Sequence, residues 1–373
     1  GPRPVAPRHI PPPGSGVTPR CVPPPPPPAP APPPLGRVAD PARRRMARGE
    51  PSLSRKCSTT PGGENGMRYG LCVPCLGEFA EPRQVADLAR RAEEAGWDGF
   101  FVWDHVVFPY GAVDVADPWV LLTLVAAATE RIRLGPLVTP VARRRPGTLA
   151  RQTTSVDRLC GGRLVLGAGL GFTLEAEYGT WGEPAEPREV AERLDEGLAL
   201  LTELWSGEKV DFHGAHLSAT DVTFLPTPVQ RPRPPIWIGC NWPNRLPLRR
   251  AARWDGIAPM IIGSDGSFGP TPEIVTELIG AVTEYREDTT SFDVVITGRT
   301  PADRPDTACA TVEAIAAAGA TWWLEGFHPG PGEYVEALRR VTAGPPRRGR
   351  TAGRGTAERE RDDAYRARSD RPG

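Results

Sequence analysis

Lysine and long apolar runs are nearly missing from this sequence. Only Lys56 and Lys209 are lysines among its 373 residues, and no run of about 18 apolar residues occurs. The scarcity of lysine argues against Schiff-base chemistry, because that chemistry needs a desolvated lysine amine at the active site. The lack of a long apolar run excludes a transmembrane helix.

Net charge is also absent. Lys+Arg and Asp+Glu each number 45, so no overall field favours nucleic acid or an anionic membrane as a partner. The N-terminus lacks the basic start and apolar stretch of a secretory signal. The 7 cysteines are spread along a long chain, which favours reduced thiols and a cytoplasmic location over a disulfide scaffold.

The two ends of the chain differ in composition from its centre. Residues 1–66 hold 20 of the 46 prolines, and residues 344–373 hold nine arginines and five acids but almost no large apolar side chain. We expect both segments to be disordered, because they bury too little apolar surface to offset the entropy of ordering. The central 277 residues, 67–343, have the size of one (β/α)8 barrel, and Met67 would be a natural initiator.

Short apolar stretches alternate with amphipathic ones throughout 67–343. Strands are predicted at 69–73, 99–103, 132–138, 163–168, 235–239, 256–259, 292–297 and 321–325, and helices at 82–95, 118–129, 147–158, 187–205, 246–253, 272–286, 307–318 and 333–341. A short β excursion, 210–222, separates the fourth helix from the fifth strand. Eight strand–helix repeats favour an α/β fold closed into a TIM-like (β/α)8 barrel over an open doubly wound sheet.

The active site of such a barrel is formed by the loops that follow its strands. These loops lack the clustered ligands of a metal centre and the strand-end carboxylates of a retaining glycosidase. Cys72 and Cys75 form a C-x-x-C at a strand end, away from any helix N-terminus, so we interpret them as packing residues. The run Arg143, Arg144 and Arg145 is interpreted as a surface charge cluster, with a site for a substrate anion as the alternative.

One histidine and several glycines do follow the strands. His105 comes after Asp104 at the end of the second strand, and imidazole passes protons in either direction near neutral pH. A glycine-rich stretch, 167–171, follows the fourth strand, and Gly239 begins another after the fifth. Glycine lets the backbone approach a flat or phosphorylated ligand, although a plain tight turn also uses it.

Longer strings resemble the bacterial luciferase-like family. They are Trp103-Asp-His105, LGPLVTP at 134–140, ARQTTSVDR at 150–158, GGRLVLGAGLG at 161–171 and PTPVQRPRPPIWIG at 226–239. The resemblance spans the whole of 67–343. It implies a TIM-like barrel that binds FMN or the deazaflavin coenzyme F420, forms a homodimer or larger homo-oligomer, and acts as a monooxygenase or oxidoreductase on a small organic substrate.

The resemblance also implies roles for individual residues. His105 matches a proton donor or acceptor beside the cofactor ring, and Asp104 matches a residue that orients this loop or contacts the cofactor. The remaining matches are cofactor contacts: Leu137, Val138 and Thr139, where F420-binding members often have a non-prolyl cis peptide, then Gly169, Leu170 and Gly171, and finally Gly239, Cys240 and Asn241. The resemblance implies no metal.

The choice of cofactor and reaction stays open at this point. FMN and F420 both carry a planar ring and a phosphate, while the Asp104-His105 pair and Thr139 followed by proline look more like the F420 branch. Phe172 stands where F420-dependent sugar-phosphate dehydrogenases carry a proton-accepting Glu, which argues against that activity. The alternative function is a flavin-binding accessory protein without turnover.

Overall fold

The structure is a computed structural model that describes residues 66–111, 113–263, 269–287 and 291–347. The chain divides into two units, Gly1–Thr59 and Thr60–Gly373, and every described residue belongs to the second. The expected disordered segments therefore lie outside the described residues, apart from residue 66 and residues 344–347.

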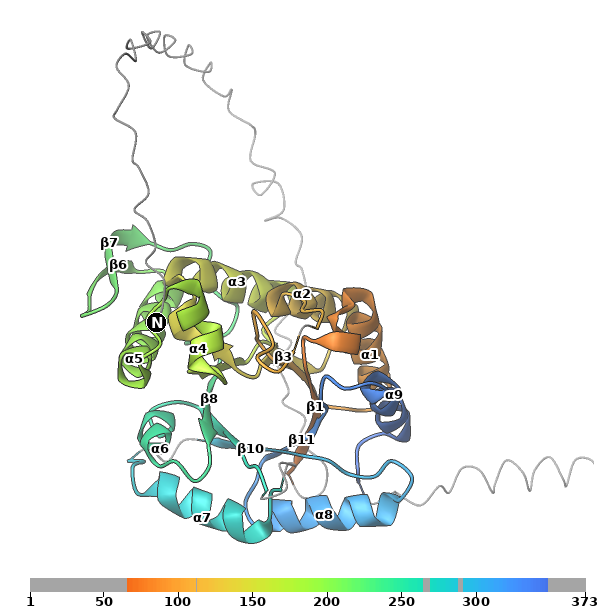
Figure 1. Ribbon diagram of the computed structural model, residues 1–373. Helices are drawn as coiled ribbons and strands as arrows, with labels where there is room; N and C mark the ends of the chain where they lie inside the picture. Colours follow the sequence, from red (N-terminus) through yellow and green to blue (C-terminus); the bar gives the residue numbers. More distant parts are fainter. Residues whose placement is uncertain (1–65, 112, 264–268, 288–290, 348–373) are drawn as a thin grey trace, which may run out of the picture. The chain divides into compact units, whose positions relative to one another are not determined.

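Parallel strands form the centre of the second unit (Figure 1). They are β1 (Arg68–Val73), β2 (Gly99–Val102), β3 (Arg133–Pro136), β4 (Thr139–Pro140), β5 (Leu166–Gly169), β8 (Ile236–Asn241), β9 (Gly256–Met260), β10 (Asp293–Gly298) and β11 (Trp322–Gly326). Their order in the sheet is β3-β2-β1-β11-β10-β9-β8-β5-β4.

Hydrogen bonds between β3 and the residues just before β5 close the sheet. The Leu134 amide of β3 donates to the Arg163 carbonyl (3.2 Å), and the Leu134 carbonyl accepts from the Val165 amide (2.9 Å). β3 lies within the predicted strand 132–138, whereas β4 follows that range directly, and the cis peptide Leu137–Val138 lies between the two strands. The predicted TIM-like α/β barrel is therefore confirmed.

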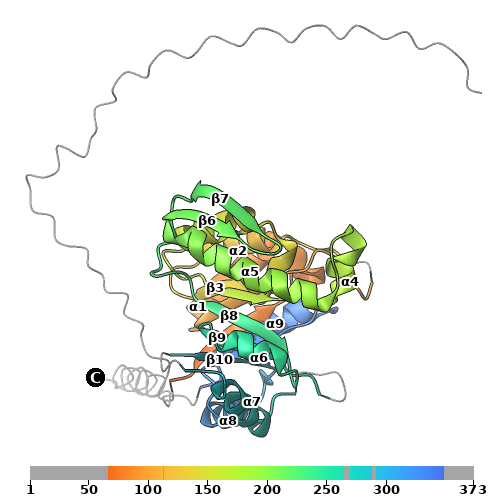
Figure 2. The same ribbon diagram turned by 90° about the vertical axis from the view of Figure 1, so that its left-hand side faces the viewer.

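Helices surround the strands (Figures 1 and 2). The long ones are α1 (Pro82–Glu94), α2 (Pro118–Ala128), α3 (Pro146–Leu159), α5 (Pro187–Ser206), α7 (Pro272–Thr283), α8 (Pro305–Ala317) and α9 (Glu333–Ala343), and α6 (Leu246–Ala251) is shorter. All of these except α9 have proline at their first or second position. Proline suits the first turn because its φ is helical and its missing N–H would have no partner there.

The predicted β excursion is a hairpin of β6 (Lys209–His213) and β7 (Ser218–Thr223) that lies beside α5 (Figures 1 and 2). Glu196 on α5 accepts hydrogen bonds from the amides of residues 215–217 in the hairpin turn, at 2.8–2.9 Å. This side chain therefore fixes the turn to the helix.

Large side chains fill the interior of the barrel. Trp237 packs against Phe101 and Trp322, with ring centroids 5.1 and 5.3 Å apart. Side chains alternate between the two faces of a strand, so Ile236 and Ile238 point to the helices while Trp237 points inward. A ligand must therefore bind beyond this layer of aromatic rings.

The C-terminal end of the barrel lies close to the predicted boundary. α9 ends at Ala343, and Gly344 follows with φ 75°. Arg347, which we expected in the tail, pairs with Asp98 at 2.6 Å and lies over the Tyr69 ring. Within the described ranges, no helix has the length and apolarity needed to span a bilayer.

Candidate active site

His105 is held at the carboxyl end of the barrel by a buried carboxylate. Its Nδ1 lies 2.6 Å from Glu177 Oε1, and the two side chains are 12% and 2% exposed. The rings of Trp103 and His105 pack in a T-shaped arrangement, with ring centroids 6.0 Å apart. Because Glu177 engages Nδ1, Nε2 is the ring nitrogen left to exchange a proton with a ligand.

Trp103 also faces a second histidine. The ring centroids of Trp103 and His328, which follows β11, are 6.2 Å apart. Burial lowers the pKa of His328, so this neighbour favours the neutral form.

Glu177 is a site residue that the sequence did not reveal. It ends the four-residue helix α4 (Leu174–Glu177). No repeating apolar pattern in the sequence predicts this helix. Gly171 precedes this helix with φ +96°, a conformation that favours glycine, and a Cβ there would lie 3.4 Å from Glu177 Cγ. The Tyr178 hydroxyl donates to the Leu170 carbonyl (2.8 Å) and so ties α4 back to the end of β5.

Asp104 is fully buried and saturated with hydrogen bonds. It accepts from Thr139 Oγ1 at 2.8 Å, from Arg143 Nη2 at 2.5 Å, and from Arg144 Nε and Nη2 at 3.1 and 2.8 Å. Of the two roles expected for Asp104, these contacts support orientation of the loop. Arg143 belongs to the short helix η3 (Val141–Arg143), and it also donates through Nη1 to Glu177.

The interpretation of the arginine run as a surface cluster is wrong for two of its members. The side chains of Arg143 and Arg144 are only 7% and 16% exposed, whereas Arg145 is exposed. Two carboxylates face two guanidiniums, so the formal charges balance when His105 is neutral. We call Asp104, His105, Thr139, Arg143, Arg144 and Glu177 the mouth cluster.

An apolar side chain, Val138, adjoins Thr139 of the mouth cluster and lies between two glycines. A Cβ at Gly169 would lie 2.6 Å from the Val138 side chain, and one at Gly239 would lie 2.7 Å from it. Val138 therefore occupies the space that side chains at both positions would fill. Leu137 and Val138 are both partly accessible, and the cis peptide expected from the resemblance joins them.

The other residues expected to contact a cofactor differ in how accessible they are. Leu170 and Gly171 are partly accessible just after β5, and Asn241 is exposed at the end of β8. Cys240 instead packs with the side chains between the sheet and the helices, and burial raises its pKa to about 12. Its thiol therefore points away from the barrel mouth, and only its main chain is available there.

The C-x-x-C cysteines are packing residues, as interpreted from the sequence. Cys72 and Cys75 are buried thiols, and burial raises the pKa of each to about 12. Neither thiol is therefore ionised at neutral pH.

His105 opens onto a cavity of about 330 Å³. The residues that line it come from the chain after β2 and from the chain before α3: His105, Val106, Val115, Ala116, Asp117, Pro118, Arg143 and Arg144. It combines a titratable ring with apolar walls, which is the usual composition of a small-molecule site.

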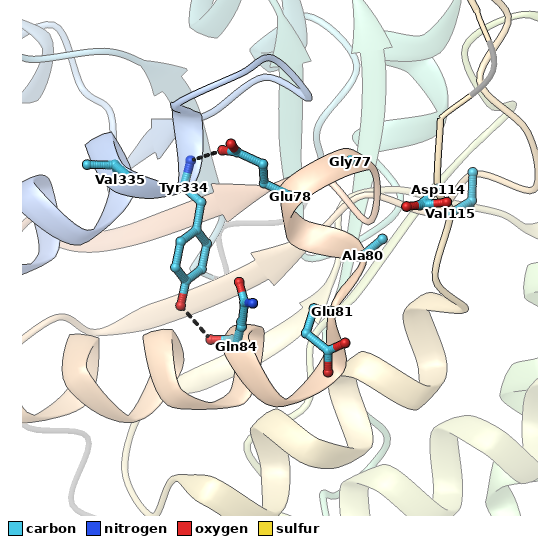
Figure 3. A pocket seen from close by; sticks show the side chains of 9 residues that line it. All are labelled: Gly77, Glu78, Ala80, Glu81, Gln84, Asp114, Val115, Tyr334 and Val335. Atoms are coloured by element: carbon cyan, nitrogen blue, oxygen red, sulfur yellow. Dashed lines mark hydrogen bonds between the residues drawn. The ribbon is translucent and has the colours of Figure 1, made fainter.

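A second cavity, of about 480 Å³, lies between η2 (Gly77–Ala80), α1 and α9 (Figure 3). Two of its three carboxylates already hold the backbone. Glu78 accepts from the amides of Gly332 and Tyr334, at 3.1 and 3.0 Å, and Glu81 caps α1. The Tyr334 hydroxyl donates to the Gln84 carbonyl (Figure 3). The cavity at His105 is therefore the better candidate for the active site.

Comparison with protein families gives the class to which the chain belongs. Residues 59–308 match the model of the luciferase-like monooxygenase family. The chain is a member of this family, which confirms the resemblance found in the sequence.

One relative is the F420-dependent glucose-6-phosphate dehydrogenase of Microbacterium testaceum, 35% identical over 216 residues. This match covers 57% of the chain and 60% of the relative, so the chain spans less than two thirds of that protein.

Solved structures share the fold. They include the monooxygenase RslO1 from Streptomyces bottropensis, with TM-score 0.60 and 23% identity over 74% of this chain and 98% of that one. They also include the coenzyme F420 dependent tetrahydromethanopterin reductase from Methanopyrus kandleri, with TM-score 0.58 and 17% identity over 74% and 97%.

Proposed function

We propose that the protein is an oxidoreductase that uses coenzyme F420 or FMN and acts on a small organic substrate. The observation that carries this proposal is the His105–Glu177 contact at the barrel mouth, together with the apolar Val138 side chain between Gly169 and Gly239. Together they provide a proton-exchanging group beside a surface on which a planar ring could lie.

The residues at the mouth fit a planar cofactor. Val138, flanked by Gly169 and Gly239, presents apolar surface without projecting neighbours, and Leu137 is accessible beside it. These residues would support the ring. Gly171 and Asn241, which are accessible after β5 and at the end of β8, would contact its polar groups. The bound cofactor would supply hydride transfer or oxygen chemistry.

The protein's own residues would then manage the proton and the orientation. His105 donates or accepts a proton at Nε2, and Glu177 holds the ring through Nδ1. Asp104 connects this loop to Thr139 next to Val138, so the histidine and Val138 are fixed together. Trp103 packs in a T-shaped arrangement against the histidine ring.

F420 is the cofactor we favour. The relative from Microbacterium testaceum is named as F420-dependent, and the Asp104-His105 pair and Thr139 followed by proline resemble the F420 branch of the family. We further propose that the protein functions in the cytoplasm as a homodimer or larger homo-oligomer, without nucleic-acid or membrane partners, and that the folded enzyme begins near Met67.

The test is a titration of the purified full chain with F420 and with FMN, followed by cofactor fluorescence. We expect F420 to bind with micromolar or tighter affinity. Gly169→Ala should weaken this binding about tenfold, because the added Cβ forces the Val138 side chain from its place. Gly147→Ala on α3 is the control, since its Cβ would meet no atom within 4 Å.

Two results would count against the proposal. Tight FMN binding without F420 binding would reverse the choice of cofactor. Binding of neither would remove the proposed function.

A further inference from the structure

Trp103 contacts two histidine rings that come from different strands. Its indole makes T-shaped contacts with His105 and with His328, at centroid distances of 6.0 and 6.2 Å and interplanar angles of 71° and 79°. His105 follows β2 and His328 follows β11, and β1 lies between these two strands in the sheet. The indole therefore links the histidine assigned to proton exchange with the chain that leaves β11.

Main-chain hydrogen bonds to β1 fix the positions of both partners. The Trp103 amide donates to the Val73 carbonyl at 2.9 Å, and the Phe327 amide donates to the Cys72 carbonyl at 3.1 Å. Val73 and Cys72 are the last two residues of β1, and Phe327 directly precedes His328 in the chain. The Trp103 and His328 rings therefore project from backbone that is tied to the same strand end.

The chain that carries His328 is also anchored to its other neighbours. The His328 amide donates to Glu333 Oε2 at 3.3 Å, and Glu333 is the first residue of α9. Arg299, which follows β10, donates to both carboxylate oxygens of Glu333, at 3.0 and 2.9 Å. Its guanidinium lies over the Phe327 ring, 5.4 Å from the centroid. A side chain on a segment anchored in this way can hold its neighbour in one orientation.

The aromatic layer inside the barrel restricts how the indole can move. Trp103 packs against the cluster of buried side chains that includes Trp237 and Trp322. Protein interiors are close-packed, so the indole has little room to move into the barrel. Its orientation therefore depends on the rings that contact it at the mouth, which include His105 and His328.

We propose that His328 is a positioning residue: it holds the Trp103 indole, and the indole holds the His105 ring in the orientation needed for proton exchange. This proposal rests on the proposed function, in which His105 exchanges the proton. Loss of the His328 ring should lower the rate about 2–10-fold, because one aromatic pair contributes an energy of that size. The role needs the ring of His328 and not a charge on it, since burial lowers its pKa and favours the neutral form.

The first test is NMR of the histidine rings in the full chain without cofactor, which has 5 histidines. His328→Ala should shift the ring signals of His105, because the indole that contacts both rings is no longer held. His328→Phe should return these signals close to their original positions, since it restores an uncharged ring. In a Trp103→Leu background, His328→Ala should cause no further shift, because the connecting ring is absent.

His216→Ala is the control for loss of a histidine elsewhere. The His216 side chain is 18% exposed and pairs with Glu192 on α5, so its removal should leave the His105 signals unchanged.

The second test is the single-turnover oxidation of bound reduced cofactor by menadione, which takes up a hydride and a proton to become menadiol. His328→Ala should lower this rate about 2–10-fold, with the dissociation constant of the cofactor changed less than about twofold. His328→Phe should restore most of the rate.

The outcomes separate this proposal from the proposed function. Unchanged His105 signals in His328→Ala, or an equal shift in the Trp103→Leu background, would overturn the proposal. So would an unaltered menadione rate in His328→Ala when His105→Ala lowers that rate. If neither cofactor binds, or if His105→Ala leaves the rate unaltered, the proposed function fails, and the NMR result still decides whether His328 positions His105.

Discussion

The barrel contains two buried clusters of acids and bases that differ in what they reach. Three members of the mouth cluster, His105, Arg143 and Arg144, line the cavity at His105. The second cluster consists of Thr300, Trp323, Glu325 and Arg340. Glu325 accepts from the Thr300 amide (2.9 Å) and from Trp323 Nε1 (3.0 Å), and lies 3.5 Å from Arg340 Nε. None of its four residues lines either cavity described above.

The difference shows that burial of charge does not by itself make a functional site. Burial raises the pKa of Glu325 and lowers that of Arg340, although this pair only joins β11 to α9. In the mouth cluster, the Glu177 carboxylate instead holds His105 through Nδ1, which leaves Nε2 for a ligand. A site therefore needs both a titratable group and an opening next to it.

The largest expected effect comes from removing one arginine of each cluster. Arg143→Met and Arg340→Met should each destabilise the fold by about 3–5 kcal/mol, because each leaves a buried carboxylate short of its partner. Denaturant unfolding measures this loss. Only Arg143→Met should also reduce the turnover of the protein that remains folded. Equal losses of turnover in the two variants would contradict the claim that only the mouth cluster has a functional role.

The stability of the Arg340→Met variant should also depend on pH. A carboxyl whose pKa is raised by folding binds its proton more tightly in the folded state, so it favours folding at low pH and loses this contribution as the pH rises through the folded pKa. Burial already raises the pKa of Glu325, and loss of the arginine raises it further. We therefore expect this variant to be less destabilised near pH 5 than near about pH 8. The same loss at both pH values would contradict the account.

A smaller effect is expected from Glu177→Gln, which keeps the shape of the side chain but removes its charge. A hydrogen bond to a charged group is worth about 1.5–3 kcal/mol, so kcat should fall about 10–100-fold while KM changes little. The matched control is Glu175→Gln, an exposed carboxylate on the same short helix. A change in KM alone would place Glu177 in substrate binding and not in the positioning of His105.

Cysteine reactivity should show a clear contrast between the native and unfolded protein. In a variant with Cys21→Ser and Cys57→Ser, which lie outside the described residues, the five remaining cysteines are all buried. The pKa values of Cys72, Cys75 and Cys240 are raised to about 12. We expect no reaction with a disulfide reagent at about pH 8 until the protein is unfolded. Rapid reaction of native Cys72 or Cys75 would make the C-x-x-C a redox candidate.

The smallest effect is expected from shortening the chain. A protein of residues 67–347 should unfold at the same midpoint as the full chain. Ending it at 343 should cost at most about 1 kcal/mol through loss of the exposed Arg347–Asp98 pair. Thermal unfolding of the three proteins makes the comparison. Loss of cooperative unfolding in the 67–347 protein would show that residues outside this range support the barrel.

The sequence could predict the barrel because its signals are local and periodic. Val85, Leu88, Ala89 and Ala92 recur at helical spacing and are all buried on α1. The alternation of faces along β8 also carries usable information. Trp237 points into the barrel, so Gly239 and Asn241, two and four positions later, lie on the same face of the strand. Cys240 lies on the opposite face and points to the helices.

The partners of His105 could not be predicted because they depend on contacts between distant segments. Glu177 lies 72 residues after His105 on a helix of four residues, too short to show a period. Arginines are normally exposed, so the sequence alone predicts a surface position for Arg143 and Arg144. Their burial depends on Asp104, which lies 39 and 40 residues away in the sequence.

The central claim is that His105 exchanges the proton at the site of a cofactor-binding barrel. The most direct test is the single-turnover rate of His105→Ala with reduced cofactor bound, measured beside the cofactor's dissociation constant. We predict a rate about 10²–10⁴-fold below that of the unaltered protein, with cofactor affinity changed less than about threefold. An unaltered rate at full cofactor occupancy would contradict the claim and leave His105 with a structural role.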